Sequence, residues 1–427
     1  MTHPHFQPDR RRWLAAGAAW GSLGLAGCAT PSTQGPPIGR VVVVGGGFGG
    51  ATAARYLRLW GGNVQVTLVE RQAQFVSCPM SNLVVGGLRQ MADISHGFDG
   101  LRALGVQVVQ GEAAHIDGAA RQLRLADGRV LPYDRLIISP GIDFMLDQVP
   151  GLAEAFASNQ AVHAWKAGPQ TATLRQQLQA MPDGGVLAIS IPRAPYRCPP
   201  APYERACLAA AYLKRNKPRS KVLVLDANPE IQSKKALFER AFAQHYAGII
   251  EYQPNTELKE VAGGLARFEF DDVKADVLNV VPPQRAADLA RHAGLLTVNQ
   301  RWVGVNWLSF ESTAMPGVHV LGDALFPAPQ MPKSGHMANQ QAKVAAAAVI
   351  QLLKGEPINP DPLVMNTCYS FVTPAEAVHV ASVHHYDAAQ RTFLPVHGAG
   401  GLSVAANELE ARYALNWATT IWHDMLG

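Results

Sequence analysis

The clearest pattern of apolar positions begins at residue 41, where four consecutive valines predict a strand buried on both faces of a parallel sheet. A glycine-rich turn follows at once, and Gly45, Gly47 and Gly50 stand in it at the spacing G-x-G-x-x-G. Residues 51–59 are small and apolar, which predicts that the turn opens a helix. A second strand is predicted over 64–70 and ends in Glu70.

This order of strand, turn, helix, strand and acid is typical of a dinucleotide-binding domain. The glycines let the backbone approach a pyrophosphate, and the helix N-terminus offers it free N–H groups. The carboxylate of Glu70 would accept a hydrogen bond from a ribose hydroxyl. The alternative is a glycine-rich turn that binds nothing, and the complete order of parts favours the dinucleotide site.

Further apolar runs predict a return to this domain after a second α/β unit. A strand over 133–138 leads into a tight turn at Gly141, and strands over 185–190 and 221–226 flank a predicted helix over 206–214. Residues 317–324 form a strand that reaches Gly322 and Asp323 at a helix start, where an acid commonly binds the ribityl chain of a flavin. A helix over 336–353 follows.

The second α/β unit departs from a nucleotide-binding domain at its first loop. Residues 191–200 are Ile-Pro-Arg-Ala-Pro-Tyr-Arg-Cys-Pro-Pro and contain no glycine. Proline has no N–H donor and a fixed φ, so this loop cannot cradle a pyrophosphate with successive amides. We therefore predict that NAD(P)H does not bind there.

Together these patterns predict an α/β protein with two Rossmann-like domains, one FAD-binding and one a degenerate NAD-type domain, and a smaller C-terminal α+β domain. The FAD-binding domain comprises 38–155 and 291–360, the second domain 156–290, and the C-terminal interface domain 361–427.

Composition excludes several other classes of function. The chain has 427 residues, and its net charge of 37 − 33 = +4 is too small to indicate a nucleic-acid partner. Its 14 histidines form no H-E-x-x-H grouping, and its five cysteines show neither C-x-x-C nor C-x-x-C-H spacing. We predict no metal site and no covalently attached c-type haem in this chain.

Residues 1–37 have the pattern of an export signal followed by a tether. Arg10, Arg11 and Arg12 precede a short apolar run, which resembles a twin-arginine signal and predicts a periplasmic protein. Leu25-Ala26-Gly27-Cys28 resembles a lipobox, so membrane attachment through a lipid on Cys28 is predicted. The alternative is that Cys28 only lies near an ordinary cleavage site.

Several motifs resemble the flavin-binding subunit of flavocytochrome c sulfide dehydrogenase, a relative of the sulfide:quinone oxidoreductases. Besides the glycine turn they are Ser77-Cys-Pro-Met-Ser-Asn82, Trp165-Lys-Ala-Gly168, Arg197-Cys-Pro-Pro-Ala-Pro-Tyr-Glu-Arg205, Pro282-Pro-Gln-Arg285, Phe310-Glu-Ser312, Met331-Pro-Lys-Ser-Gly335 and Asn366-Thr-Cys-Tyr-Ser370. The resemblance covers essentially the whole chain after the export segment.

The resemblance implies FAD as the cofactor, joined covalently through the sulfur of Cys78. It implies that Cys198 handles the sulfur of sulfide or a related compound, and that a separate c-type cytochrome accepts the electrons. Lys333 would place a positive charge near the flavin ring, whereas its alternative role is that of a surface lysine. Glu204 would act as a base, or would form a salt bridge with a neighbour such as Arg205.

The chain departs from the family pattern at Leu325, where the resemblance places a second redox cysteine. Three alternatives follow: Cys207 is the partner of Cys198, Cys198 works alone, or sulfide turnover is lost and the protein is a flavin-carrying electron-transfer or accessory subunit. In the second and third alternatives Cys207 is a buried structural thiol, and Cys368 is interpreted in the same way.

Overall fold

The computed structural model describes residues 36–269 and 271–427, and residues 37–427 form one unit. The segment that carries Arg10 to Arg12 and Cys28 lies outside the described residues, so export and lipidation stay predictions. Within the described ranges, no helix combines the length and the apolar character needed to cross a membrane.

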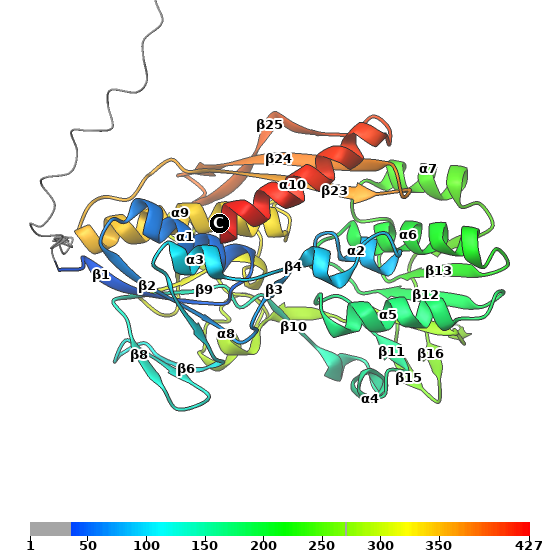
Figure 1. The fold of residues 1–427 in the computed structure, drawn as a ribbon, viewed down its shortest axis with the longest axis horizontal. Helices are drawn as coiled ribbons and strands as arrows, with labels where there is room; N and C mark the ends of the chain where they lie inside the picture. Colours follow the sequence, from blue (N-terminus) through cyan, green and yellow to red (C-terminus); the bar gives the residue numbers. More distant parts are fainter. Residues whose placement is uncertain (1–35, 270) are drawn as a thin grey trace, which may run out of the picture. The chain divides into compact units, whose positions relative to one another are not determined.

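The valine run forms β1 (Gly39–Val44), an inner strand of a seven-stranded sheet with the order β20-β21-β22-β9-β1-β2-β5 (Figure 1). Val43 lies opposite Leu68 of one neighbour and Ile137 of the other, and all three side chains are buried. β-Branched side chains on both faces of a parallel sheet explain why this run has no alternating pattern. The helices α1 (Phe48–Trp60) and α9 (Gly335–Lys354) pack against each other. The other strands of the sheet are β2 (Val64–Glu70), β5 (Gln107–Gln110), β9 (Arg135–Ile138), β20 (Val305–Asn306), β21 (Glu311–Ser312) and β22 (Val318–Val320).

The second sheet is parallel throughout and has the order β11-β18-β12-β13-β14. Its strands are β11 (Ala161–Val162), β12 (Val186–Ile191), β13 (Lys221–Asp226), β14 (Ile250–Gln253) and β18 (Val277–Val280), and its helices are α5 (Pro169–Ala180), α6 (Ala201–Asn216) and α7 (Lys235–His245). Helix α6 begins five residues earlier than the prediction at 206. Pro200 is its N-cap residue and Pro202 lies in its first turn, where the missing N–H has no helical partner to lose.

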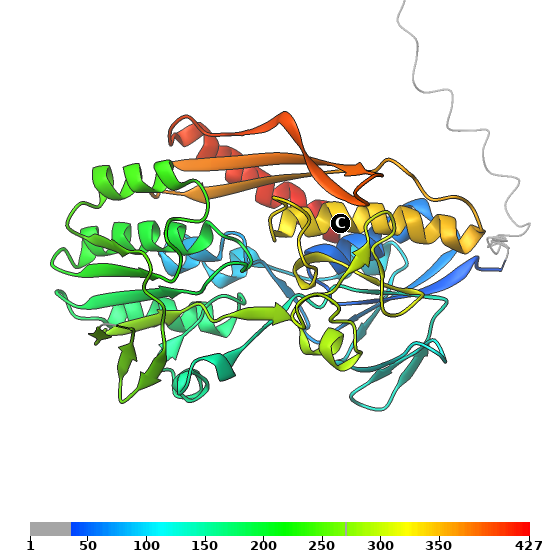
Figure 2. The same cartoon turned by 180° about the vertical axis from the view of Figure 1, so that it is seen from behind.

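Two connections join these domains. The first is the antiparallel pair of β10 (Ile142–Phe144) and β19 (Gln284–Ala286), which lie in the segments where the chain enters and leaves the second domain. The C-terminal sheet, composed of β23 (Leu363–Phe371), β24 (Ala377–Asp387) and β25 (Thr392–Leu402), lies across both (Figures 1 and 2), because β23 packs on α9 and on α6. Helix α10 (Glu408–Leu426) packs on this sheet and on α1. The predicted fold class, with two Rossmann-like domains and an α+β tail, is confirmed.

Shorter elements complete the described fold. They are β3 (Phe75–Val76), α2 (Ser81–Val85), η1 (Met91–Ile94), β4 (Ser95–His96), α3 (Asp99–Ala103), β6 (Ala113–Asp117), β7 (Gln122–Leu125), β8 (Val130–Pro132), η2 (Leu146–Gln148), α4 (Leu152–Ala157), β15 (Glu260–Ala262), β16 (Leu265–Arg267), β17 (Asp272–Val273), α8 (Asp288–His292) and η3 (Gly322–Ala324). Among them, α2 matters most for the site, since it follows Cys78 and contacts α6.

Candidate flavin and thiol site

The glycine turn after β1 has the shape that a pyrophosphate requires. A Cβ at Gly45, whose φ is +94°, would lie 2.5 Å from the carbonyl oxygen of Ser139, and one at Gly50 would lie 1.8 Å from that of Gly45. At Gly47, the N-cap residue of α1, an added Cβ would meet no atom within 4 Å. The turn is therefore tightly packed on the protein side and open at the helix N-terminus, where an anion binds best.

Glu70 is held at this turn by backbone donors. The amide of Gly46 donates to its Oε2 at 2.6 Å, and the amide of Gln72 donates to its Oε1 at 2.8 Å. A carboxylate fixed by two backbone N–H groups keeps lone pairs free for a further donor. Its place at the end of β2 fits the ribose hydroxyls of a dinucleotide.

Asp323 has a carboxylate oxygen that accepts no hydrogen bond from the described residues. It lies in η3 just after Gly322, whose φ is +74° and whose amide donates to Gln341 at 2.9 Å. The Oδ1 atom of Asp323 is buried and has no hydrogen-bond partner among the described residues. An orphaned carboxylate oxygen is costly unless a ligand donates to it, which fits the hydroxyls of a flavin ribityl chain. Gly141, with φ +68°, follows β9 at the neighbouring strand end.

Cys78 lies beside Arg197, which the sequence prediction did not assign to the site. The Nη2 atom of Arg197 donates to the Cys78 sulfur at 3.1 Å, and the amide of Ala167 donates to it at 3.4 Å. The Nη1 atom of Arg197 lies 3.9 Å from Oδ2 of Asp323, and its side chain also donates to the carbonyl of Trp165. A guanidinium beside a thiol favours the thiolate, which is the nucleophilic form. The signal for Arg197 was its position next to Cys198 in the Arg-Cys-Pro-Pro motif.

Lys333 is buried, so its interpretation as a surface lysine is wrong. Its ammonium donates to the carbonyl of Asp323 at 2.9 Å and to that of Leu325, and lies 3.7 Å from the centre of the Trp302 ring. Burial lowers the pKa of Lys333 to about 7, against the attraction of Asp323. Leu325 is itself buried in the core of the first domain. The role of Lys333 beside a bound flavin stays a prediction.

Cys198 and Cys368 form the thiol pair of the site. Cys198 has φ +53°, and its amide donates to the carbonyl of Lys333 at 2.9 Å. Its thiol neighbours that of Cys368 on β23. The interaction with Cys368 raises the pKa of Cys198 well above the usual value, with burial and Glu204 adding to the effect. The same interaction lowers the pKa of Cys368 to about 7, and the charge of Lys234 contributes to that shift.

This pairing corrects the interpretation of Cys368 as a structural thiol. Cys368, rather than Cys207, is the cysteine beside Cys198, and Cys207 is fully buried within α6. Leu325 therefore does not leave Cys198 without a partner. The available signal was the motif Asn366-Thr-Cys-Tyr-Ser370, which carried part of the family resemblance but to which no role was assigned.

Glu204 lies near the pair but does not form the expected salt bridge with Arg205. Its carboxylate accepts from Asn82 Nδ2 at 2.7 Å and from the amide of Phe371 at 2.8 Å. Arg205 donates instead to Asn82 Oδ1 and Asn279 Oδ1, and no ion pair joins it to Glu204 in the part of the chain that the structure describes. Burial raises the pKa of Glu204, and its role as a base stays a prediction.

Strand β13 of the second domain ends at Asp226, whose carboxylate already accepts hydrogen bonds from this chain. Asp226 accepts from the hydroxyls of Tyr203 at 2.6 Å and Tyr252 at 3.1 Å, and from Asn228. Such an acid binds the ribose in a nucleotide domain, and here the chain's own donors occupy it. That NAD(P)H does not bind the second domain stays a prediction. Residues 36–269 and 271–427 contain no group of three or more His, Cys, Asp or Glu side chains placed to hold a metal ion.

The fold and the site together define the class of protein as a two-domain flavoprotein of the disulfide-reductase type. The profile of the pyridine nucleotide-disulphide oxidoreductases matches residues 39–179. The crystal structure of the sulfide:quinone oxidoreductase from Aquifex aeolicus superposes with a TM-score of 0.75 at 20% identity, over 91% of each chain. That likeness shows the fold alone.

The family follows from more specific matches. The profile of the sulfide dehydrogenase [flavocytochrome c] flavoprotein chain, central, matches residues 171–282, and that of flavocytochrome c sulphide dehydrogenase, flavin-binding, matches 360–426. The flavoprotein chain of that enzyme from Chlorobaculum thiosulfatiphilum is 62% identical over 45 residues, which are 10% of this chain and 94% of that sequence. This chain belongs to the family of flavocytochrome c sulfide dehydrogenase flavoprotein chains.

A more distant relative matches over a longer region. The mitochondrial sulfide:quinone oxidoreductase of Mus musculus is 26% identical over 315 residues, which are 66% of this chain and 65% of the mouse protein. The family resemblance derived from the motifs is thereby confirmed, including its link to the sulfide:quinone oxidoreductases.

Proposed function

We propose that this chain is an FAD-dependent oxidoreductase that oxidises sulfide, or a related small sulfur compound, at the pair Cys198 and Cys368. The observation that carries the proposal is that these two thiols are neighbours in a chain of the sulfide dehydrogenase family. The residues that would hold FAD are Gly45, Gly47, Glu70, Cys78, Gly141, Gly322 and Asp323. When bound, FAD supplies the two-electron acceptor that returns the reduced pair to its disulfide.

The unequal pKa values of the two thiols give the reaction a direction. Hydrosulfide attacks the Cys198 sulfur of the disulfide, the S–S bond breaks, and its electron pair leaves on Cys368 as a thiolate. Cys198 then carries the persulfide, and a second hydrosulfide removes its outer sulfur as HSSH, which leaves both cysteines reduced. Thiol–disulfide exchange favours release of the sulfur with the lower pKa, and that sulfur is Cys368, with a pKa of about 7. Two basic side chains adjoin Asp323: Arg197 lies near its carboxylate, and Lys333 donates to its carbonyl.

The electron acceptor that we propose is a separate c-type cytochrome. In support, the Chlorobaculum thiosulfatiphilum relative is named as a flavocytochrome c chain, and this sequence has no C-x-x-C-H motif for a haem of its own. A quinone is the second candidate, because the mouse relative and the Aquifex aeolicus structure are sulfide:quinone oxidoreductases. We also propose export to the periplasm, supported by Arg10 to Arg12, with lipidation of Cys28.

Anaerobic titration of the flavin-loaded protein with sulfide tests this function. We expect flavin absorbance to bleach within the mixing time of seconds, and oxidised cytochrome c to restore it faster than a soluble quinone does. Restoration by the quinone alone would assign the second acceptor. A protein that is fully loaded with flavin but does not bleach would contradict sulfide oxidation and favour an accessory subunit.

Covalent attachment of FAD to Cys78 has a separate test. After denaturation and digestion of the wild-type protein, we expect flavin to remain on the peptide that contains Cys78, because the thiolate favoured by Arg197 is the nucleophile. Cys78→Ser should release all of its flavin on denaturation, whereas Cys207→Ser should retain it. Mass spectrometry measures both. Flavin released freely from the wild type would show that Cys78 only packs near the ring.

A further inference from the structure

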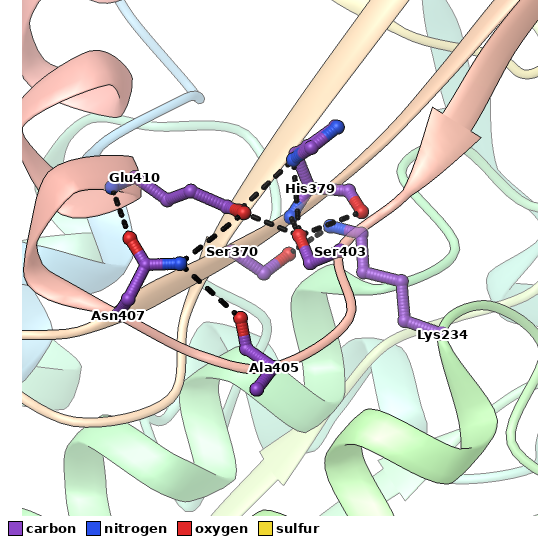
Figure 3. Close-up of polar contacts among 7 residues, drawn as sticks. All are labelled: Lys234, Ser370, His379, Ser403, Ala405, Asn407 and Glu410. Atoms are coloured by element: carbon purple, nitrogen blue, oxygen red, sulfur yellow. Dashed lines mark hydrogen bonds and ion pairs between the residues drawn. The ribbon is translucent and has the colours of Figure 1, made fainter.

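Lys234 is a buried basic side chain to which the proposed function assigns no role. It is the N-cap residue of α7, with φ +59°, and only 6% of it is exposed. Its ammonium donates to the hydroxyl of Ser370 at 2.8 Å, as Figure 3 shows. Within the described ranges, no carboxylate lies at salt-bridge distance from it. A buried ammonium without an anion is costly, so its position calls for a negative partner.

The geometry of β23 identifies that partner. Side chains two residues apart on a strand lie on the same face, so Ser370 and Cys368 share one. The ammonium that binds Ser370 therefore lies on the Cys368 side of the strand. Cys368 is also the neighbour whose negative charge acts most strongly on Lys234, ahead of Glu204, Cys198 and Glu410.

The charges around the thiol pair are unequally placed. The charge of Glu204 acts on Cys198 more strongly than that of Lys234, whereas on Cys368 the order is reversed. Glu204 lies on α6, and two hydrogen bonds fix its carboxylate. Its negative charge therefore stays nearer in effect to Cys198 than to Cys368. The negative charge on a reduced pair is thereby drawn toward Cys368.

Other titratable groups near β23 have hydrogen-bond partners of their own. On α9, His336 accepts from the amide of Thr367 at 2.9 Å. On β24, His379 lies 2.9 Å from Glu410 of α10, and Ser403 donates to the same carboxylate at 2.6 Å (Figure 3). Glu410 is thus occupied by these two donors, and Glu204 by Asn82 and the amide of Phe371, which leaves Cys368 as the anion for Lys234.

We propose that Lys234 is the counter-cation of the Cys368 thiolate and so fixes which sulfur leaves when the disulfide is attacked. The proposal rests on the proposed function for the step in which hydrosulfide bonds to Cys198 and the S–S electron pair passes to Cys368. Lys234 is a positioning residue in this step, because it acts through Cys368 and exchanges no atom with the substrate.

The test is the pH dependence of Cys368 alkylation in the flavin-loaded, thiol-reduced protein, followed by mass spectrometry of each cysteine with iodoacetamide under anaerobic conditions. The thiolate is the reactive form, so the midpoint of the rate profile reports its pKa. We expect a wild-type midpoint near pH 7 and an upward shift of about one unit or more in Lys234→Gln, since removing a cation destabilises the thiolate. Lys234→Arg should restore the wild-type midpoint, and Lys235→Gln, at the exposed neighbour, should not change it.

Lys234→Met is a second neutral variant in case Lys234→Gln does not fold, and thermal melting identifies which variants are native. A general structural role for Lys234 would alter melting but not the midpoint. Equal midpoints in wild type and in a folded neutral variant would overturn the proposal. Failure of the proposed function would appear differently, as a wild type that sulfide does not bleach while its Cys368 profile is normal.

Discussion

Cys368→Ser is expected to reduce the rate of flavin bleaching by sulfide by about 10³-fold or more, the scale on which loss of a covalent participant acts. Serine has nearly the same size as cysteine but cannot close a disulfide with Cys198 or leave as a thiolate. The flavin should remain bound, because the glycine turn, Glu70 and Asp323 are unchanged. Stopped-flow absorbance after anaerobic mixing with sulfide measures the rate.

Cys207→Ser is the matched control for this variant. Cys207 is more deeply buried than Cys368, at 0% exposure, and it lies within α6 and outside the pair of neighbouring thiols. We expect its bleaching rate to stay within a few-fold of the wild-type rate. If Cys368→Ser bleached as fast as the wild type, Cys198 would work alone, as one of the sequence alternatives held. If Cys207→Ser lost the reaction instead, the partner assignment would be wrong.

The first domain could be predicted from the sequence because its signals are local. The valine run, the glycine turn and Glu70 lie within thirty consecutive residues, from 41 to 70, and each is explained by a local steric or electrostatic requirement. The ends of elements are harder to predict, as at α6, which begins at Ala201 because Pro200 and Pro202 are compatible with a first turn. Local patterns of this kind carry no information on which distant elements meet.

The thiol pair was missed because it depends on such a meeting. Cys368 lies 170 positions after Cys198, and β23 brings the two together by packing on α6. The family resemblance places the second cysteine shortly after Asp323, where this chain has Leu325. Lys234 and Arg197 were missed for the same reason, since each acquires its role from a partner in another domain or loop. Burial of Lys333 was likewise not visible in a helix-start motif.

Arg205→Leu is expected to lower the free energy of unfolding by about 3–5 kcal/mol, the range for breaking a buried charged network. The guanidinium donates to Asn82, Asn279 and the carbonyls of His163 and Ala164, at 2.6–3.0 Å. Leucine fills most of the space but leaves these acceptors buried and unpaired. Burial lowers the pKa of Arg205 to about 10, so the charge is itself costly here, and the loss is smaller than four separate hydrogen bonds would give.

Urea denaturation of the flavin-loaded protein, followed by far-ultraviolet circular dichroism, measures this loss, with Arg215→Leu as the control. Arg215 lies on the same helix α6 but is exposed, so its replacement should change the free energy by no more than about 0.5 kcal/mol. Arg205 ties α6 to α2, and α2 begins three residues after Cys78, so the destabilised variant should also lose sulfide-dependent bleaching. Equal stability of the two variants would mean that the apolar packing of α6, and not the Arg205 network, holds the two halves of the site together.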